Sequence, residues 1–262
     1  MAWGLRNPYG IAFHPEVGCS SPSTAWTPAN RHVIGDYDDL YEIHEGEWYG
    51  WPDFASGIRL DDPAWGPGGA HRGPLLAEWP NPEPPKPFVT FQPHAAANGI
   101  DFAPADGSFG FPGDGFVALF GDLAPITTTR LMTPAGFKVV RVEMATRRVV
   151  DFAVNRIAGP ASKLPHNGFE RPSHCTFGPD GALYVTDFGE IDIAPEAGGI
   201  RVQAESGTLW RVRRVPGAED GLNPPDPLIV PFYAGQYLTW AVAGIATAAV
   251  VTWIARRLGR RR

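Results

Sequence analysis

Alternating apolar and polar residues mark three groups of short strands along the chain. Each group opens with a strand that runs into a Pro- and Gly-containing turn: GIAFHPEVG from Gly10, GIDFAPADG from Gly99 and CTFGPDG from Cys175. The second and third turns lead into the strands FVALFGD and ALYVTDFG, at residues 116–122 and 182–189. A further alternating strand closes each group: DLYEI ending at Ile43, KVVRV ending at Val142 and TLWRV ending at Val212. A period of two places one side chain inward and the next outward, so the pattern predicts half-buried sheets.

Three such antiparallel units in series predict an all-β fold, and specifically a β-propeller with long loops. A β-sandwich is the alternative. The Pro-, Gly- and Trp-rich run over residues 61–87 has little strand character and is interpreted as an insertion. The segment 216–231 holds five prolines and predicts a stiff spacer, which we extend over residues 216–236.

Residues 237–255 read YLTWAVAGIATAAVVTWIA, nineteen residues without a charge or a proline. A helix of that length spans about 28 Å, close to the ~30 Å hydrocarbon core of a bilayer. Tyr237, Trp240 and Trp253 lie where interfacial aromatic residues belong, and five arginines follow within residues 256–262. The sequence therefore predicts one C-terminal transmembrane helix, with a cytoplasmic tail over 256–262 and the preceding domain on the periplasmic or extracellular side.

Charge and composition narrow the class of protein. Removing the five terminal arginines from the net charge of −6 leaves −11 for the preceding residues, which argues against a nucleic-acid partner. Gly and Pro make up over a fifth of the chain, which excludes a helical bundle, and 12% aromatic residues argue against disorder. Cys19 and Cys175 are more simply explained as buried apolar residues than as a disulfide.

Four motifs occur in a characteristic order: GLRNPYGIAFHP from Gly4, DDLYEIHEGEWYGWPDF from Asp38, HAAANGIDF from His94 and GFERPSHCTFGPDGALYVTDFG from Gly168. Together they resemble the soluble quinoprotein glucose/sorbosone dehydrogenase family, over residues 2–215. The resemblance covers the C-terminal half of that family's domain. It implies a partial six-bladed β-propeller of about three blades over residues 1–215, followed here by the transmembrane helix. It also implies pyrroloquinoline quinone (PQQ) and calcium as cofactors, a sugar or aldehyde substrate and a separate electron acceptor.

Individual residues can be carried over from the family's motifs. Arg6 and Asn7 match the Arg–Asn pair that contacts the quinone, and a guanidinium suits a planar, anionic ligand because it offers a bidentate fork and a stacking face. Arg171 matches the first of two family arginines, and Ser173 stands at the second position. The family's lysine is not recognisable in FVALFGDLAP. Asp36, Asp38 and Asp39 could bind calcium through oxygen, or form a solvated turn before a strand.

The general-base histidine of this family belongs to the half of the propeller that the resemblance does not cover. His94 and His174 lie in segments that we interpret as loops facing the pocket, whereas surface or core roles are expected for the remaining histidines: His14, His32, His44, His71 and His166.

Three blades in an arc leave two exposed sheet edges and an open central face. A second polypeptide or a second copy of the chain is therefore expected to complete the ring, unless the chain is a truncated product. Truncation is the interpretation that we favour, because MAWGLRNPYG lacks the basic and apolar regions of a signal peptide. Two other functions stay open. One is a carbohydrate-binding or scaffold propeller, whose stacking aromatic residues would be Trp48, Trp51, Trp65 and Trp79. The other is a calcium-dependent lactonase-type hydrolase.

Overall fold

Antiparallel strands make up nearly all of the regular structure. The computed structural model describes residues 1–14, 19–23 (backbone only), 37–60, 83–124, 133–165, 167–194 and 199–214. Within these residues the regular elements are β-strands and one 3-10 helix, η3 (Ala161–Lys163). The predicted all-β class is confirmed. The predicted spacer, transmembrane helix and basic tail lie outside the described residues.

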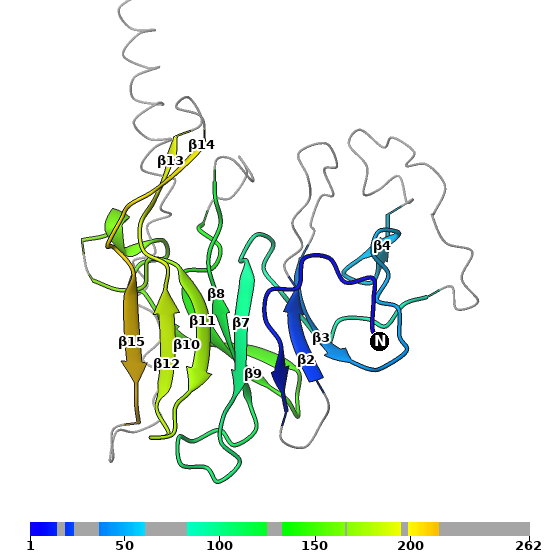
Figure 1. Ribbon diagram of the computed structural model, residues 1–262. Coiled ribbons are helices and arrows are strands. Elements are labelled where there is room, and N and C mark those ends of the chain that lie inside the picture. The colour runs from blue at the N-terminus through cyan, green and yellow to red at the C-terminus, as the bar shows by residue number, and fades with distance from the viewer. Residues whose placement is uncertain are drawn as a thin grey trace, which may run out of the picture.

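Three sheets follow one another along the chain and lie side by side (Figure 1). The first sheet has the order β1 (Ala12–Phe13), β2 (Cys19–Ser23), β3 (Asp38–Ile43) and β6 (Val89–Phe91). The second contains β7 (Ala97–Phe102), β8 (Gly115–Leu119), β9 (Lys138–Glu143) and β10 (Arg148–Val154), in that order. The third contains β11 (Pro172–Phe177), β12 (Leu183–Asp187) and β15 (Thr208–Val212). Each sheet is therefore a meander of neighbouring strands, as the repeated units predict.

Two small hairpins extend from the connections. β4 (Phe54–Ala55) pairs with β5 (Ile58–Arg59) in the connection between β3 and β6. β13 (Ile191–Ala194) pairs with β14 (Gly199–Val202) between β12 and β15, and projects beyond the end of the third sheet (Figure 1). Neither hairpin was predicted, because their strands are only two to four residues long.

The turn between β11 and β12 shows how the repeated Pro-Gly motif folds. The amide of Gly181 donates to the Gly178 carbonyl at 2.9 Å, and the Gly178 amide donates to Ala182 at 2.9 Å. Gly181 has φ +71°, a left-handed conformation that glycine adopts without steric cost. Asp180 accepts from the Ala182 amide through its Oδ1. The motif thus closes a tight hairpin by its own backbone chemistry.

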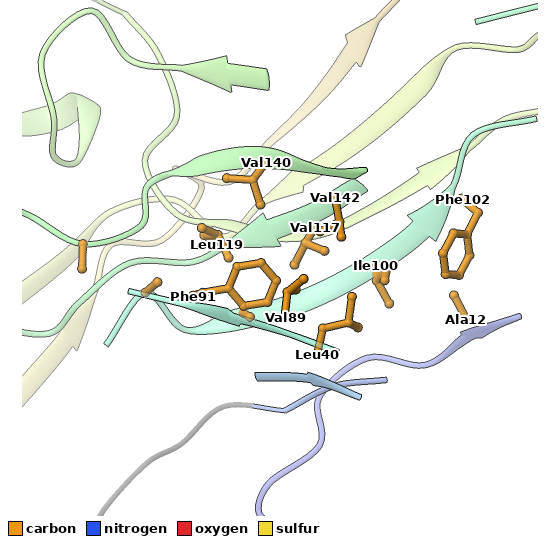
Figure 2. Close-up of a cluster of buried hydrophobic side chains, with 13 residues drawn as sticks. Ala12, Leu40, Val89, Phe91, Ile100, Phe102, Val117, Leu119, Val140 and Val142 are labelled. Carbon is orange, nitrogen blue, oxygen red and sulfur yellow. The ribbon is translucent and has the colours of Figure 1, made fainter. Parts of the chain in front are cut away.

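Strand β8 of the second sheet is covered on both faces, which corrects the expectation of a half-buried strand there. All five residues of β8 are buried. Val117 and Leu119 join one apolar cluster with Leu40 and Phe91 of the first sheet, as Figure 2 shows. The alternate positions of β8, Phe116 and Ala118, join a second cluster with third-sheet residues, and the third-sheet members are Cys175, Leu183 and Val185. The alternation therefore sorts side chains between two cores, instead of between a core and water.

Cys175 lies in the second of these clusters as a free, buried thiol. Its Sγ is 3.1 Å from the Phe116 carbonyl oxygen, and burial raises the pKa of the thiol to about 12. The interpretation of Cys175 as a small buried residue is confirmed. The side chain of Cys19 lies outside the described residues.

Candidate functional site

The first and second sheets are aligned so that their first strands start at the same end. Just beyond β1, His14 Nε2 lies 3.0 Å from the Gly113 carbonyl oxygen, and its ring packs edge-on against Phe102 at the end of β7. At the opposite end, the amide of Ala96, just before β7, donates to Asp38 Oδ2 at 2.6 Å. The loops that lead into β1 and β7 are thus neighbours.

The third sheet follows the same alignment. Asp101 Oδ2, near the end of β7, accepts from Thr176 Oγ1 at 2.9 Å and from the Phe177 amide at 2.7 Å, at the end of β11. Just before β11, Arg171 contacts the end of β8. The loops before β1, β7 and β11 therefore lie at one end of the three sheets, and these loops carry Arg6, His94 and Arg171.

Arg6 and Asn7 form the exposed part of this end. The Arg6 guanidinium carbon lies 4.9 Å from the centroid of the Trp51 ring, a cation–π distance, and the side chain is half-buried. Asn7 is exposed and has φ 51°, a left-handed conformation that asparagine tolerates. A cavity of about 20 Å³ lies behind Arg6, lined also by Asp39 and Tyr49. It has room for about one water molecule, so a larger ligand would contact Arg6 and Asn7 from the solvent side.

Arg171 has a different environment from Arg6. It is 2% exposed, and its Nη1 donates to the carbonyl oxygens of Gly121 at 3.3 Å and Asp122 at 3.0 Å. Its guanidinium carbon lies 5.2 Å from the Phe120 ring centroid and 5.0 Å from that of Phe137. The guanidinium is enclosed by two rings and engaged by the β8–β9 connection. This geometry assigns Arg171 a positioning role and does not present its charge to an outside ligand.

Asp122 completes that connection. Its carboxylate is 3% exposed and accepts from the Ala124 amide at 2.9 Å and from the Ala135 amide at 2.8 Å, tying the two ends of the connection together. Gly136 has φ +86°, and a Cβ there would lie 2.5 Å from the Gly121 Cα. The segment FVALFGDLAP, in which no lysine was recognised, therefore carries a buried aspartate, Asp122, whose carboxylate accepts two backbone hydrogen bonds.

The predicted calcium ligands do not form a common cluster in the described residues. Asp38 and Asp39 are consecutive in β3, so their side chains point to opposite faces of the sheet. Asp38 accepts from Ala96, whereas Asp39 Oδ2 accepts from Ser56 Oγ at 2.9 Å and from the Tyr41 hydroxyl at 3.4 Å. No group of three or more His, Cys, Asp or Glu side chains arranged to hold a metal occurs in the described part. Asp36 lies outside the described residues.

His94 lies in the loop before β7, with φ 66° and a half-buried ring. Burial lowers its pKa below the ordinary 6.5, and the nearby Asp122 carboxylate opposes that effect. His174 lies within β11 and is exposed, not in a loop as expected, because β11 already begins at Pro172. His14 and His44 are also described, while His32, His71 and His166 lie outside the described residues.

Asp187 was missed by the sequence analysis although it organises the lead-in to β11. Its Oδ1 accepts from the amides of Arg171 at 2.7 Å and Gly189 at 3.1 Å. Its Oδ2 accepts from the Glu170 amide at 2.7 Å and from the Trp210 indole nitrogen at 3.3 Å. The available signal was an aspartate ending a buried strand immediately before Phe-Gly, in ALYVTDFG.

Comparison with known proteins gives structural matches only. No family model matches the sequence, and no curated protein matches it. Among solved structures, a glucose dehydrogenase has a TM-score of 0.47 at 19% identity, covering 82% of this chain and 46% of that one. The calcium structure of a Trichoderma reesei carbohydrate-active enzyme of family AA12 has a TM-score of 0.47 at 18% identity, covering 76% and 52%. The holo form of the pyranose dehydrogenase PQQ domain from Coprinopsis cinerea has a TM-score of 0.45 at 20% identity, covering 76% and 54%.

These solved structures are of the same kind as the family that the motifs resemble. The chain spans about half the length of each of them.

In the residues that the structure describes, no helix is long and apolar enough to cross a bilayer. The segment 237–255, for which a membrane span was predicted, is not among them.

Proposed function

We propose that this chain is part of a PQQ-dependent sugar or aldehyde dehydrogenase. The observation that carries the proposal is the gathering of the three lead-in loops at one end of the sheets, where Arg6 and Asn7 are accessible. Arg6 and Asn7 belong to the GLRNPYG motif on which the family resemblance rests. In the active protein this end of the three sheets forms one side of the cofactor site.

The chain's own residues have distinct parts in this proposal. Pyrroloquinoline quinone, when bound, supplies the acceptor for the hydride that leaves the anomeric or alcohol carbon of the sugar. Arg6 fits the quinone's anionic edge because its guanidinium is oriented by Trp51 and the residue is only partly buried, although Nη1 itself is buried. Asn7 offers an exposed amide beside it. Arg171 fixes the β8–β9 connection by donating to the carbonyl oxygens of Gly121 and Asp122.

His94 is the histidine of this half that we place beside the cofactor end, while the general base of the resembled family belongs to the other half. Burial lowers the pKa of its imidazole, and the Asp122 carboxylate opposes that effect. Its loop also carries Ala96, whose amide is held by Asp38, so the loop's position is fixed from the first sheet. Asp38 and Asp39 do not fit calcium, because each is engaged by a different protein group, and no step is assigned to the ion.

The active form, in this proposal, contains further blades. The three sheets do not close on themselves, and the segment entering β1 exposes an apolar row on one side. Tyr9, Ile11 and Phe13 are 64%, 62% and 74% exposed. Exposed apolar rows of this kind are typical of surfaces that are covered by a partner. A longer gene product, a second polypeptide or a second copy would each supply that cover.

Membrane attachment belongs to the proposal as well. The uncharged segment 237–255 and the arginines after it support a single C-terminal helix, with the sheet domain periplasmic or extracellular and the tail cytoplasmic. The electrons would then pass to a separate acceptor on the same side as the sheets.

The test uses the full chain, titrated with PQQ with and without calcium and followed by the absorbance of the quinone. We expect a spectral change on binding, which Arg6→Ala weakens about tenfold or more because a charge-assisted, bidentate contact is lost. Arg201→Ala is the matched control, because it removes an exposed arginine from β14 and the same net charge. Aldoses and an artificial dye are then added to measure turnover.

The absence of any spectral change with the wild-type chain contradicts the proposal, as does an equal loss in the Arg6→Ala and Arg201→Ala variants. Sugar binding measured by calorimetry without quinone binding would instead support a carbohydrate-binding propeller.

A further inference from the structure

A second concave site lies away from Arg6, between the loop that carries η3 and the connection from β12 to β15. It has a volume of about 440 Å³, within the range typical of small-ligand sites. The groove lies on the third sheet and shares no lining residue with the cavity behind Arg6. Its chemistry is set by one aromatic ring, Trp210, and three acidic residues, Glu170, Asp187 and Glu190.

The aromatic wall of this groove is held in place. Trp210 lies in β15 with a half-buried side chain, and its ring packs edge-on against Phe169 with centroids 5.5 Å apart. Its indole nitrogen donates to Asp187 Oδ2 at 3.3 Å. A ring fixed in this way, beside carboxylates, is a suitable surface for a cation because the face of the indole carries negative charge density.

The lining of the groove offers a ligand more hydrogen-bond acceptors than donors. The four donors on Asp187 occupy both of its oxygens. Glu170 accepts from Ser162 through its Oε1 and Oε2, which leaves further lone pairs on each oxygen. Glu190 is exposed, and its side chain has four lone-pair sites for a ligand. The remaining side-chain donors are fewer: the Thr208 hydroxyl and the Asn167 amide.

The charge of the lining also favours a cationic ligand. None of the described residues that line the groove is a lysine or an arginine. Lys163, the basic residue of the neighbouring η3, lies 3.6 Å from Asp192 and is engaged there. An anionic ligand is therefore disfavoured. A neutral polyol can also donate its hydroxyls to these carboxylates, but it carries no charge to balance theirs.

We propose that this groove binds an organic cation through a primary ammonium group, which lies on the Trp210 face and donates to Glu190 and Glu170. An ammonium has three donors and no acceptor, so it complements an acceptor-rich lining. An amino sugar, a polyamine and a lysine side chain share this chemistry. The groove shares no lining residue with the cavity behind Arg6, although Asp187 also holds the lead-in to β11. The two proposals are therefore tested with different ligands and different variants.

Calorimetric titration of the full chain with three probes separates these sources and tests the class. Glucosamine carries both a sugar ring and an ammonium, cadaverine carries the ammonium alone, and glucose carries the ring alone. We expect glucosamine binding to be weakened by Glu190→Gln, which locates it in this groove, and any binding of glucose at the Arg6 end to be insensitive to that variant. Binding by cadaverine as well identifies the ammonium as sufficient, whereas binding by glucosamine alone adds a sugar ring to the requirement.

Two variants locate the binding. Glu190→Gln keeps the shape of the side chain and should weaken glucosamine binding about two- to fivefold, the effect of one partly exposed ion pair. Trp210→Phe weakens the cation–π contact and should also reduce affinity. Glu205→Gln is the matched control, because it removes an exposed carboxylate from the same connection but outside the groove. Thermal unfolding of each variant checks that it remains folded.

Three outcomes overturn the proposal: glucose binding that Glu190→Gln weakens as much as it weakens glucosamine binding, no binding by either amine, or an equal loss of affinity in Glu190→Gln and Glu205→Gln. The first would identify a saccharide groove, and the last would identify non-specific attraction to surface charge.

Discussion

His94 combines a left-handed backbone, a half-buried ring and a nearby carboxylate, that of Asp122. Burial is the larger influence on its pKa and lowers it, because the imidazolium loses hydration inside the protein. The residue therefore links the stability of the site to pH.

The sign of that linkage follows from the direction of the shift. His94 binds a proton less readily in the folded chain than in the unfolded chain, where its pKa is about 6.5. Its neutral form therefore contributes stability above pH 6.5, which is lost as the pH falls through the folded-state pKa. We predict that His94→Asn loses less stability than the wild-type chain between pH 8 and pH 5. Asparagine suits the left-handed conformation, so the backbone should be retained.

Urea unfolding of both chains at pH 8, 6.5 and 5 measures this difference. Stability curves that run parallel for wild type and His94→Asn across the whole range would show that His94 does not carry the linkage.

At the scale of elements, β8 is the centre of the molecule. Its four side chains beyond Gly115 are divided between two cores, with Leu119 in the cluster shared with the first sheet and Phe116 in the cluster shared with the third. Sheets that use both faces in this way depend on their neighbours for burial. The second sheet therefore holds the three-sheet unit together.

Leu119→Ala tests that role. Leu119 is 2% exposed, and its truncation should lower the free energy of unfolding by about 2–5 kcal/mol, because it loses apolar contacts and leaves a cavity. Leu209→Ala, in β15, is the matched control: Leu209 is 64% exposed, and a change within about 0.5 kcal/mol is expected. Chemical denaturation gives both values. Equal effects at the two leucines would contradict the assignment of β8 to the interior.

At the scale of the whole molecule, the sheets and the C-terminal segment are proposed to lie in different solvents. Deleting residues 237–262 should release the chain from membranes that retain the full-length chain after an alkaline wash, since about twenty apolar residues are needed to span a bilayer. Replacing the five terminal arginines by glutamine while keeping 237–255 is the control, and it should leave the chain membrane-bound. Recovery of the full-length chain in the soluble fraction would refute the anchor.

Part of the fold could be predicted from the sequence because it depends on neighbours in the chain. The closing strands β3, β9 and β15 were predicted nearly to the residue from their alternation. β10 was missed although it spans Arg148–Val154. Its residues are exposed or half-buried, and β9 supplies its hydrogen bonds, so it follows from pairing more than from its own pattern.

The site divides in the same way. Arg6 and Asn7 were predicted from a compact motif, and the structure places both at the accessible end of the sheets. The role of Arg171 was not predictable, because its partners Gly121 and Asp122 are about fifty residues earlier in the chain. Asp38 and Asp39 were candidate calcium ligands in the sequence, yet both lie in β3, where consecutive side chains point to opposite faces of the sheet.

The sequence by itself determined the class of fold, the turns and the proposed anchor, since period-two alternation, Pro-Gly turn chemistry and an uncharged apolar run act over a few residues. Tertiary structure decided which core each face of β8 enters and which arginine stays accessible. It also brought Trp210 together with the acidic residues of the proposed ammonium site. Those outcomes depend on contacts between segments far apart in the chain, whose positions are fixed only when the three sheets pack against one another.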